Sequence, residues 1–282
     1  MATVTFFHAH PDDEAIATGG TMASLAEQGH RVVLVTATRG ELGEVDEGFL
    51  RPGETLGERR EVEMADAASV LGVARQTFLG YEDSGMEGEA SASRPDCFAT
   101  ADLEEAAGRL AAILGEEAAD VLVVYDEHGG YGHPDHVQVH RVGMAAAERA
   151  ATPVVYMTTM DREFMLELRR QATESEFGPD DTLEGADTMG EPASRITTEV
   201  DVTPWVATKK DAMRAHASQI GEESFFLMMP DDVFATVWGQ EWFIRVRPEP
   251  VGLGDGVREG GLVVDAVTHT LGGGAVSEGA ER

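Results

Sequence analysis

The stretch "VTFFHAHPDDEAIATGG", residues 4–20, joins an apolar run to a dense polar cluster and then to a small-residue segment. Its first four residues are β-branched or aromatic, which favours a buried strand. Helical periodicity follows from about residue 15. Two histidines and three acids stand between them, so we expect these side chains at the carboxyl end of a strand, where open α/β sheets place their ligands.

The rest of the chain repeats this alternation of strand-like and helical segments. Strand-like runs recur at 31–38, 76–81, 121–126, 154–159, 196–202 and 241–246. Helical periodicity is found at 15–28, 56–71, 102–117 and 134–149, and a Thr-Pro pair at 203–204 is typical of a helix start, here continuing to about residue 220. The pattern predicts the α/β class, with a Rossmann-like doubly wound, mostly parallel sheet and a less regular C-terminal part.

We expect a single catalytic α/β domain over residues 1–250. Residues 160–195 are acidic, carry Gly and Pro and are weakly periodic, so both a plain surface loop and a lid over the sheet edge remain open. Residues 251–282 are Gly-rich and are expected to form a partly mobile tail, in which "LVVDAVTHTL" could dock locally.

Composition narrows the class of partner and the compartment. The 282 residues include 52 acids and 21 bases, for a formal net charge of −31, so nucleic acid and anionic membranes are unfavourable partners. Cys97 is the only cysteine, which excludes an intrachain disulfide and a thiolate metal cage. With no signal-like start and no run near ~18 apolar residues, we expect a cytoplasmic protein, and a homo-oligomer remains open.

A second polar cluster, "YDEHGGYGHPDHVQVH" at 125–140, follows another strand-like run. The two clusters together hold six of the nine histidines. Loops at neighbouring strand ends can meet, and imidazoles with carboxylates are ligand types for a zinc-class ion. Two ligands near residue 10 and one near 136 would leave a coordination position for water, as in catalytic zinc sites.

The motifs "HAHPDDE" and "GGYGHPDHVQVH" together resemble the LmbE-like (PIG-L type) zinc-dependent de-N-acetylases, and within them the mycothiol-pathway deacetylase and S-conjugate amidase. The similarity covers about residues 4–145, with further matches in "TRGELGEV" (38–45), "YEDSGM" (81–86) and "RAHASQI" (214–220). The resemblance implies a metal-dependent hydrolase that removes an N-acyl group, expected to be N-acetyl, from a glucosamine-containing small molecule.

Carried over motif by motif, the resemblance assigns a role to nine residues. It implies three ligands for Zn²⁺, with Fe²⁺ able to substitute: His10, Asp13 and His136. It implies four catalytic residues: Asp12, His133, Tyr131 and Asp135. It implies two substrate-binding residues: Arg60 and Asp83.

The implied roles are those of an amide hydrolase. Asp12 is the general base for water, and His133, as an imidazolium, stabilises the oxyanion or protonates the departing amine. Asp135 orients His133 or binds substrate, and Tyr131 adds an oxyanion donor. Arg59, beside Arg60, leaves open which arginine binds the sugar.

Other polar residues of the motifs have structural interpretations. We expect His8 to support the ligands without binding the metal, and His140, four residues after His136, not to be a ligand. For Glu14, stabilisation of a helix N-terminus and a supporting role in the site both remain open. His216 is expected to be structural. The pair of glycines at 19–20 is expected to serve helix packing, because phosphate-loop spacing is missing.

Three other functions remain to be separated from the deacetylase. An amidase of mycothiol-type thiol conjugates would share the chemistry. A non-catalytic metal- or sugar-binding protein would be expected to lack Asp12 or His133, and both are present. A dinucleotide-dependent oxidoreductase would need a glycine fingerprint that does not follow the first strand.

Overall fold

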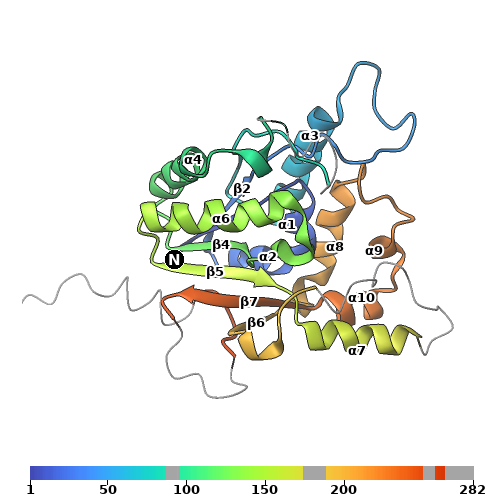
Figure 1. Ribbon diagram of the computed structural model, residues 1–282. Coiled ribbons are helices and arrows are strands. Elements are labelled where there is room, and N and C mark those ends of the chain that lie inside the picture. The colour runs from blue at the N-terminus through green and yellow to red at the C-terminus, as the bar shows by residue number, and fades with distance from the viewer. Residues whose placement is uncertain (87–93, 95, 174–188, 250–257, 264–282) are drawn as a thin grey trace, which may run out of the picture.

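The computed structural model describes residues 1–86, 94, 96–173, 189–249 and 258–263. Strands in this part form one seven-stranded sheet in the order β3-β2-β1-β4-β5-β7-β6 (Figure 1). They are β1 Thr3–His8, β2 Arg31–Thr36, β3 Arg75–Phe78, β4 Val121–Tyr125, β5 Val154–Thr159, β6 Thr198–Asp201 and β7 Gln240–Arg247. The strands from β3 to β5 run parallel, whereas β7 is antiparallel to both of its neighbours. The predicted mostly parallel α/β sheet with a less regular C-terminal part is confirmed.

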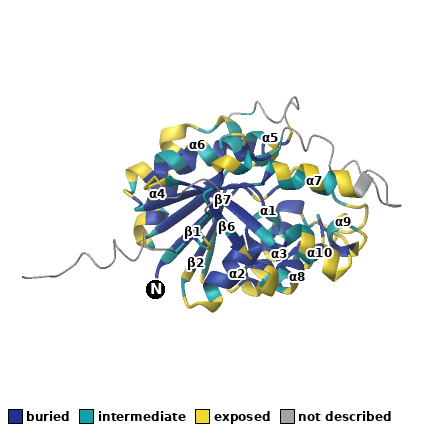
Figure 2. Cartoon of the chain, turned by 90° about the horizontal axis from the view of Figure 1, so that it is seen from below, coloured by how far each residue is buried: buried dark blue, intermediate teal, exposed yellow. Residues whose placement is uncertain are grey.

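Helices cover both faces of this sheet. They are α1 Asp13–Ala17, α2 Gly19–Glu27, α3 Leu56–Val70, α4 Leu103–Glu116, α5 Gly129–Gly132, α6 Pro134–Arg149, α7 Arg162–Thr173, α8 Val206–Ala215, α9 Phe225–Met228 and α10 Asp231–Trp238. Figure 2 shows the sheet between a layer containing α4 and α6 and a layer containing α2, α3 and α8. The molecule is therefore a three-layer sandwich.

Two apolar cores lie on opposite faces of the sheet, because successive strand residues point to opposite sides. Phe6 and Leu34 belong to the core beneath α2, α3 and α8, whereas Phe7, Val33 and Val35 belong to the core beneath α4 and α6. All five are at most 1% exposed. Burial on both faces explains why these strands read as continuous apolar runs and not as alternating ones.

The strand order places a crevice at the end of β1. After β1 the chain builds β2 and β3 on one side, then returns to form β4 on the other side of β1. The register pairs Phe6 with Val123, so both strands run side by side toward the same edge of the sheet. The loops that leave them turn to opposite faces, which is the arrangement that binds ligands in open α/β folds. The two polar clusters lie on these two loops.

Two predicted helices end differently in the structure. The helix expected over 15–28 is split into α1 and α2 at Thr18, whose backbone is non-helical (φ −139°) and whose hydroxyl group contacts the ring of His8. The helix expected to reach residue 220 ends at Ala215, because His216 turns away from the helix and bonds to Glu14.

The segment predicted to be irregular over 160–195 begins with helix α7, whose exposed face pairs Glu167 with Arg170 and Gln171 at helical spacing. Its part at 174–188 lies outside the described residues, as do 250–257 and 264–282 of the C-terminal region. The described piece between them docks on the sheet: Leu262 is 1% exposed and Glu259 exchanges backbone hydrogen bonds with the β6 edge.

No helix in the described ranges has both the length and the apolar character needed to cross a bilayer.

Candidate metal centre and active site

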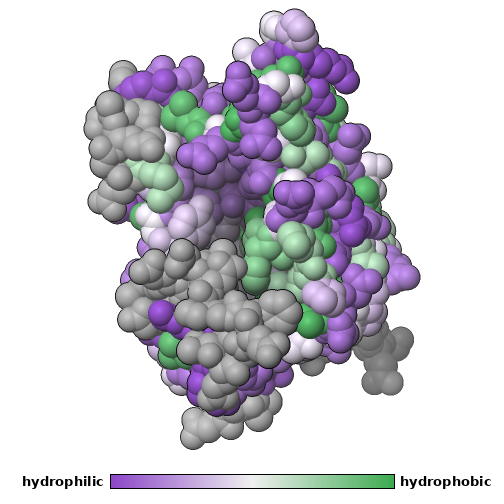
Figure 3. Space-filling model, turned by 90° about the vertical axis from the view of Figure 1, so that its right-hand side faces the viewer, coloured by the Kyte–Doolittle hydropathy of each residue, from purple (hydrophilic) through white to green (hydrophobic). Residues whose placement is uncertain are grey.

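The site is built by two loops at the carboxyl ends of β1 and β4. The first carries His10, Asp12 and Asp13, and the second leads into α6, whose beginning carries His133 and His136. Figure 3 looks onto the face toward which the parallel strands point and shows a hollow with a mostly hydrophilic visible lining. The predicted ligands and catalytic residues are thus brought to one crevice from positions more than a hundred residues apart in sequence.

Asp13 lies close to both of the other predicted metal ligands, whereas the groups of three described ligand atoms here that all lie within 4.8 Å of one another are His10–His133–His136 and His10–Asp83–Asp135. Asp13 Oδ2 lies 3.6 Å from His10 Nδ1 and 3.4 Å from His136 Nε2. Ligand atoms bound at about 2.0–2.1 Å in tetrahedral geometry are separated by about 3.3 Å. The Nε2 atom of His136 is buried and makes no hydrogen bond with any described residue. An orphaned imidazole nitrogen at this distance from a carboxylate fits a zinc-type ion.

His10 is fixed by a carboxylate on its other ring nitrogen. His10 Nε2 lies 3.0 Å from Asp135 Oδ2, and Asp135 also accepts hydrogen bonds from the backbone and hydroxyl of Ser84. Metal-binding histidines typically donate their second N–H to such a carboxylate. Among the described residues the Asp135 carboxylate therefore holds His10, whereas the resemblance implied that it orients His133 or binds substrate. The Asp135 backbone N–H donates to His133 Nδ1 at 3.1 Å.

Asp12 directly precedes the predicted ligand Asp13, and its carboxyl group is buried beside an arginine. Burial raises the pKa of its carboxyl group to about 6, an effect that the Arg60 guanidinium opposes. Arg60 Nη2 lies 3.1 Å from Asp12 Oδ2. A base with a pKa just below neutrality is ionised at physiological pH and still accepts a proton readily, so Asp12 has the properties of a general base.

The next residue, Asp13, has the opposite shift. Burial disfavours its charged form, but His136 and His10 outweigh burial and hold its pKa well below the usual value. The two adjacent carboxylates thus have different properties: Asp13 stays ionised, and Asp12 has a pKa of about 6.

His133 is buried, and its surroundings favour the neutral imidazole. Its Nδ1 atom accepts the Asp135 backbone N–H at the start of α6, so its ring proton is on Nε2. Burial, with the neighbouring His10 and His136, lowers the pKa of His133 to about 4. The structure therefore favours a neutral donor where the sequence led us to expect an imidazolium.

Tyr131 stands at the mouth of the site on the loop "GGYG". Its ring centroid is 4.8 Å from that of His136, and 52% of its surface is exposed. Burial of its hydroxyl region and nearby carboxylates raise the pKa of Tyr131, so the phenol keeps its proton and can donate it in a hydrogen bond. Asp126 shapes this loop by accepting the backbone N–H groups of His128 and Gly130.

The two predicted substrate-binding residues lie at the site, but both bond mainly to protein. Arg60 is 3% exposed and donates to the carbonyls of Pro11 and Gly40 as well as to Asp12. Arg59 pairs instead with Glu54, which resolves which arginine reaches the crevice.

Asp83 accepts the backbone N–H groups of Leu42 and Gly85. Its Oδ1 is 3.5 Å from His10 Nε2. Through Asp83, the loop after β2 is thus linked to His10.

Sequence reasoning missed Tyr125, which ends β4. Its ring stacks on His136 with centroids 4.5 Å apart and planes 4° apart, and its hydroxyl group lies 2.8 Å from His8 Nδ1. The other nitrogen of His8 contacts Thr18 at 2.9 Å, and burial lowers the pKa of His8 to about 4. Both nitrogens are occupied, so the contacts give His8 the supporting position expected of it. The position of Tyr125, directly before the second cluster, was the available signal.

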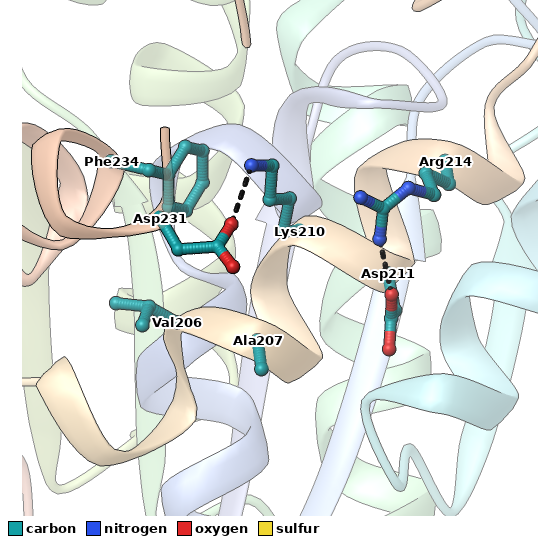
Figure 4. A pocket seen from close by; sticks show the side chains of 7 residues that line it. All are labelled: Val206, Ala207, Lys210, Asp211, Arg214, Asp231 and Phe234. Carbon is teal, nitrogen blue, oxygen red and sulfur yellow. Dashed lines mark hydrogen bonds and ion pairs between the residues drawn. The ribbon is translucent and has the colours of Figure 1, made fainter. Parts of the chain in front are cut away.

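Another pocket lies between α8 and α10 and contains none of these residues (Figure 4). Its charged groups pair with one another: Lys210 contacts Asp231 at 2.9 Å, and Arg214 contacts Asp211 at 2.5 Å. Phe234 lies beside the lysine. Charges that are neutralised within the pocket do not call for a charged ligand there.

Known sequences are similar to this chain over most of its length. The profile of the PIG-L family, GlcNAc-PI de-N-acetylase, matches residues 5–147. A 1D-myo-inositol 2-acetamido-2-deoxy-alpha-D-glucopyranoside deacetylase of Thermobifida fusca is 40% identical over 266 residues, covering 86% of this chain and 92% of that protein. A deacetylase with the same name from Catenulispora acidiphila is 38% identical over 278 residues, covering 89% and 86%.

Solved structures share the fold at lower identity. The N,N'-diacetylchitobiose deacetylase of Pyrococcus horikoshii has a TM-score of 0.53 at 22% identity, covering 89% of this chain and 87% of that one. The 4-carboxy-2-hydroxymuconate hydratase of Pseudomonas putida has a TM-score of 0.55 at 20% identity, covering 89% and 98%. Proteins of this fold therefore catalyse at least two different reactions. The fold alone does not indicate the function, which has to be argued from the sequence relatives and the chemistry of the site. On the family profile and these relatives, the chain belongs to the GlcNAc-PI de-N-acetylase (PIG-L) family.

Proposed function

We propose that this chain is a metal-dependent hydrolase that removes the N-acetyl group from a glucosamine-containing small molecule. The observation that supports this most directly is the approach of Asp13 to both His10 and His136, with the orphaned His136 nitrogen, beside a base with a pKa of about 6. Membership of a family of amide-hydrolysing deacetylases agrees with that chemistry.

We propose zinc as the ion, with iron(II) as the alternative, held by His10, Asp13 and His136. When bound, such an ion lowers the pKa of a water molecule toward neutrality and polarises a carbonyl group. The two-nitrogen, one-oxygen donor set is suited to either ion. Asp135 and Tyr125 contribute by fixing the rings of His10 and His136.

The residues of the chain then divide the work of amide hydrolysis. Asp12 takes a proton from the attacking water as the oxygen bonds to the amide carbon. His133, through its Nε2–H, and Tyr131, through its phenol, donate hydrogen bonds to the carbonyl oxygen as negative charge develops there. When the C–N bond breaks, protonated Asp12 returns its proton to the nitrogen, which regenerates the base; the acetic acid formed then passes a proton to the free amine, so the products are acetate and a protonated amine.

For the substrate, we propose an N-acetylglucosaminyl glycoside of inositol, following the names of the relatives at 38–40% identity. Arg60 and Asp83 lie on the side of the crevice formed by the loops after β1 and β2. Because their charged groups bond to the protein, we propose that they set the shape and charge of the sugar site.

The test is hydrolysis of a defined panel. The zinc-loaded protein is incubated with N-acetylglucosamine, its inositol glycoside, a mycothiol S-conjugate and N,N'-diacetylchitobiose, and freed amine is quantified. Matched samples are stripped with a chelator, and part of each is reloaded with zinc. We expect amine release that is lost on chelation, restored on reloading and fastest for the inositol glycoside.

Other outcomes of this experiment would change or contradict the proposal. Fastest cleavage of the S-conjugate assigns the chain to the amidases. Amine release that persists unchanged in the stripped protein contradicts the metal-dependent mechanism. Absence of release from every amide, with one metal ion bound per chain, contradicts the deacetylase function.

A further inference from the structure

The backbone of Asp12 is held in a conformation that aspartate rarely adopts. Its φ is 108° and its ψ −33°, within the range normally left to glycine. Such strain persists only where the surroundings fix it, and it is common in active sites. Asp12 is also the residue before helix α1, yet its side chain makes no capping bond to that helix among the described residues. Its carboxylate contacts Arg60 instead.

Glu14 provides the bond that holds this conformation. Glu14 Oε2 accepts the backbone N–H of Asp12 at 3.0 Å, while the Asp12 carbonyl accepts the N–H groups of Ala15 and Ile16. Both ends of the Asp12 peptide are thus fixed. An acid in the first helical turn usually interacts with exposed N–H groups in water, but Glu14 is 0% exposed. Its second oxygen therefore needs a buried partner.

That partner is His216, from the turn after α8. His216 Nε2 lies 2.7 Å from Glu14 Oε1, and both side chains are fully buried. The imidazole N–H at Nε2 donates to the Glu14 carboxylate, which can only accept when ionised. The backbone of His216 leaves α8 at this point, and its carbonyl accepts the N–H groups of Gln219 and Ile220.

A buried ion pair is seldom kept for stability alone, because desolvation offsets much of its attraction. What such a pair supplies is one fixed geometry. We propose that the Glu14–His216 pair is a positioning device for Asp12, holding its carboxylate in line with the attacking water. This inference rests on the proposed function, in which Asp12 is the base. His216 lies outside residues 5–147 that match the family profile, so the C-terminal half of the chain completes the site.

The chain offers a matched control in a second buried ion pair. Lys209 Nζ lies 2.7 Å from Glu241 Oε1, and both side chains are at most 2% exposed. Glu241 also accepts backbone N–H groups, those of Gly20 and Thr21 in α2. The two pairs share burial, charge and a backbone contact, but none of the contacts of the second pair involves Asp12.

The test compares Glu14→Leu/His216→Leu with Lys209→Leu/Glu241→Leu. Both double variants replace an ion pair by apolar groups, so neither leaves an unpaired buried charge. In the first we expect kcat to fall about 10- to 100-fold through misplacement of the base. KM should change less than about twofold and bound zinc should stay unchanged, since the ligands are intact. In the control, kcat should stay within about twofold at temperatures well below its Tm.

Two further comparisons link the effect to Asp12. In an Asp12→Asn background, Glu14→Leu/His216→Leu should cause no further loss of kcat. If the double variant does not fold, His216→Leu should lose kcat and His216→Gln, which keeps an N–H near the same place, should regain most of it.

The inference is overturned if Glu14→Leu/His216→Leu folds and has wild-type kcat. It is also overturned if the double variant lowers kcat by the same factor in the Asp12→Asn background as in the wild type. Equal kcat values for His216→Leu and His216→Gln would overturn it as well. The inference is supported if kcat falls in Glu14→Leu/His216→Leu but not in Lys209→Leu/Glu241→Leu, and if Asp12→Asn is itself inactive. Wild-type kcat in Asp12→Asn alone overturns both this inference and the proposed role of Asp12 as the base, but not the deacetylase function, which fails only if no amide is cleaved. Inactive Asp12→Asn with a fully active pair variant overturns this inference only.

Discussion

At the scale of single residues, the chemistry depends on two neighbouring carboxylates that the fold treats differently. Asp13 faces two imidazoles, and its pKa is held low against the effect of burial. Asp12, one residue earlier, faces Arg60 and has a pKa raised to about 6 by burial. The guanidinium keeps that rise moderate, because an opposite charge within a few ångströms favours the ionised form.

Removing the arginine should shift the pH dependence of the reaction. Arg60→Gln takes away the charge that lowers the pKa of Asp12, so that pKa rises. Because the base must be unprotonated, the acid limb of the kcat/KM profile should move to higher pH by about one unit. Activity near pH 6 should therefore fall more than activity near pH 8. Arg59→Gln is the control, since Arg59 pairs with Glu54, and its acid limb should not move. An unmoved or lowered acid limb in Arg60→Gln contradicts the assignment.

Only those site residues that belong to a recognisable sequence motif could be predicted from the sequence. His10, Asp13 and His136 belong to two compact motifs, and the structure places Asp13 close to both histidines. Side-chain direction could not be predicted, because it depends on packing: Asp135 points to His10. The partner of Glu14 lies 202 residues away in sequence, and no local pattern links the two.

At the scale of elements, the site depends on where β1 and β4 end and on how closely their helices pack. The alternation of apolar runs was sufficient to predict the strands, because strands buried on both faces have a distinctive composition. Helix ends were less predictable: α1 and α2 separate at Thr18, where a side-chain contact with His8 competes with helical continuity. The strand order, which puts β4 beside β1, comes from long-range pairing.

The packing of α2 gives a prediction about stability. A Cβ atom at Gly20 would lie 2.4 Å from Val202 Cβ, and Val202 is fully buried. Gly20→Ala should therefore lower the free energy of unfolding by about 1–3 kcal/mol through overpacking. Gly115→Ala, in α4 with no atom within 4 Å of the added carbon, should raise it by about 0.5–1 kcal/mol. Chemical denaturation of both variants measures this. Equal effects of the two substitutions contradict the role of Gly20 in close packing.

At the scale of the whole molecule, this acidic chain places several of its carboxylates together at the carboxyl ends of the parallel strands. The formal net charge is −31, and Asp12, Asp13, Asp83 and Asp135 all lie around His10 and Arg60. Buried carboxylates need positive or hydrogen-bonding partners. A divalent cation bound in this crevice would be a positive partner for these carboxylates. Metal binding is therefore expected to stabilise the fold as well as to enable the reaction.

Removal of the metal should therefore lower the melting temperature. A ligand present at 100 times its Kd stabilises the native state by about 2.7 kcal/mol, which corresponds to roughly 5–10 °C for a chain of this size. Thermal unfolding with and without a chelator measures the shift. The chelator should have little effect on His136→Ala, which lacks a ligand. An equal shift in that variant would mean that the chelator acts elsewhere.

The most direct test of the account measures bound metal and turnover together, in wild-type protein and in Asp12→Asn prepared side by side. Asparagine keeps the shape of the side chain but cannot take the proton from water. We predict about one metal ion per chain in both proteins and a kcat that is about 10²- to 10⁴-fold lower in Asp12→Asn. An Asp12→Asn protein that binds the metal and releases amine at the wild-type rate would contradict the account.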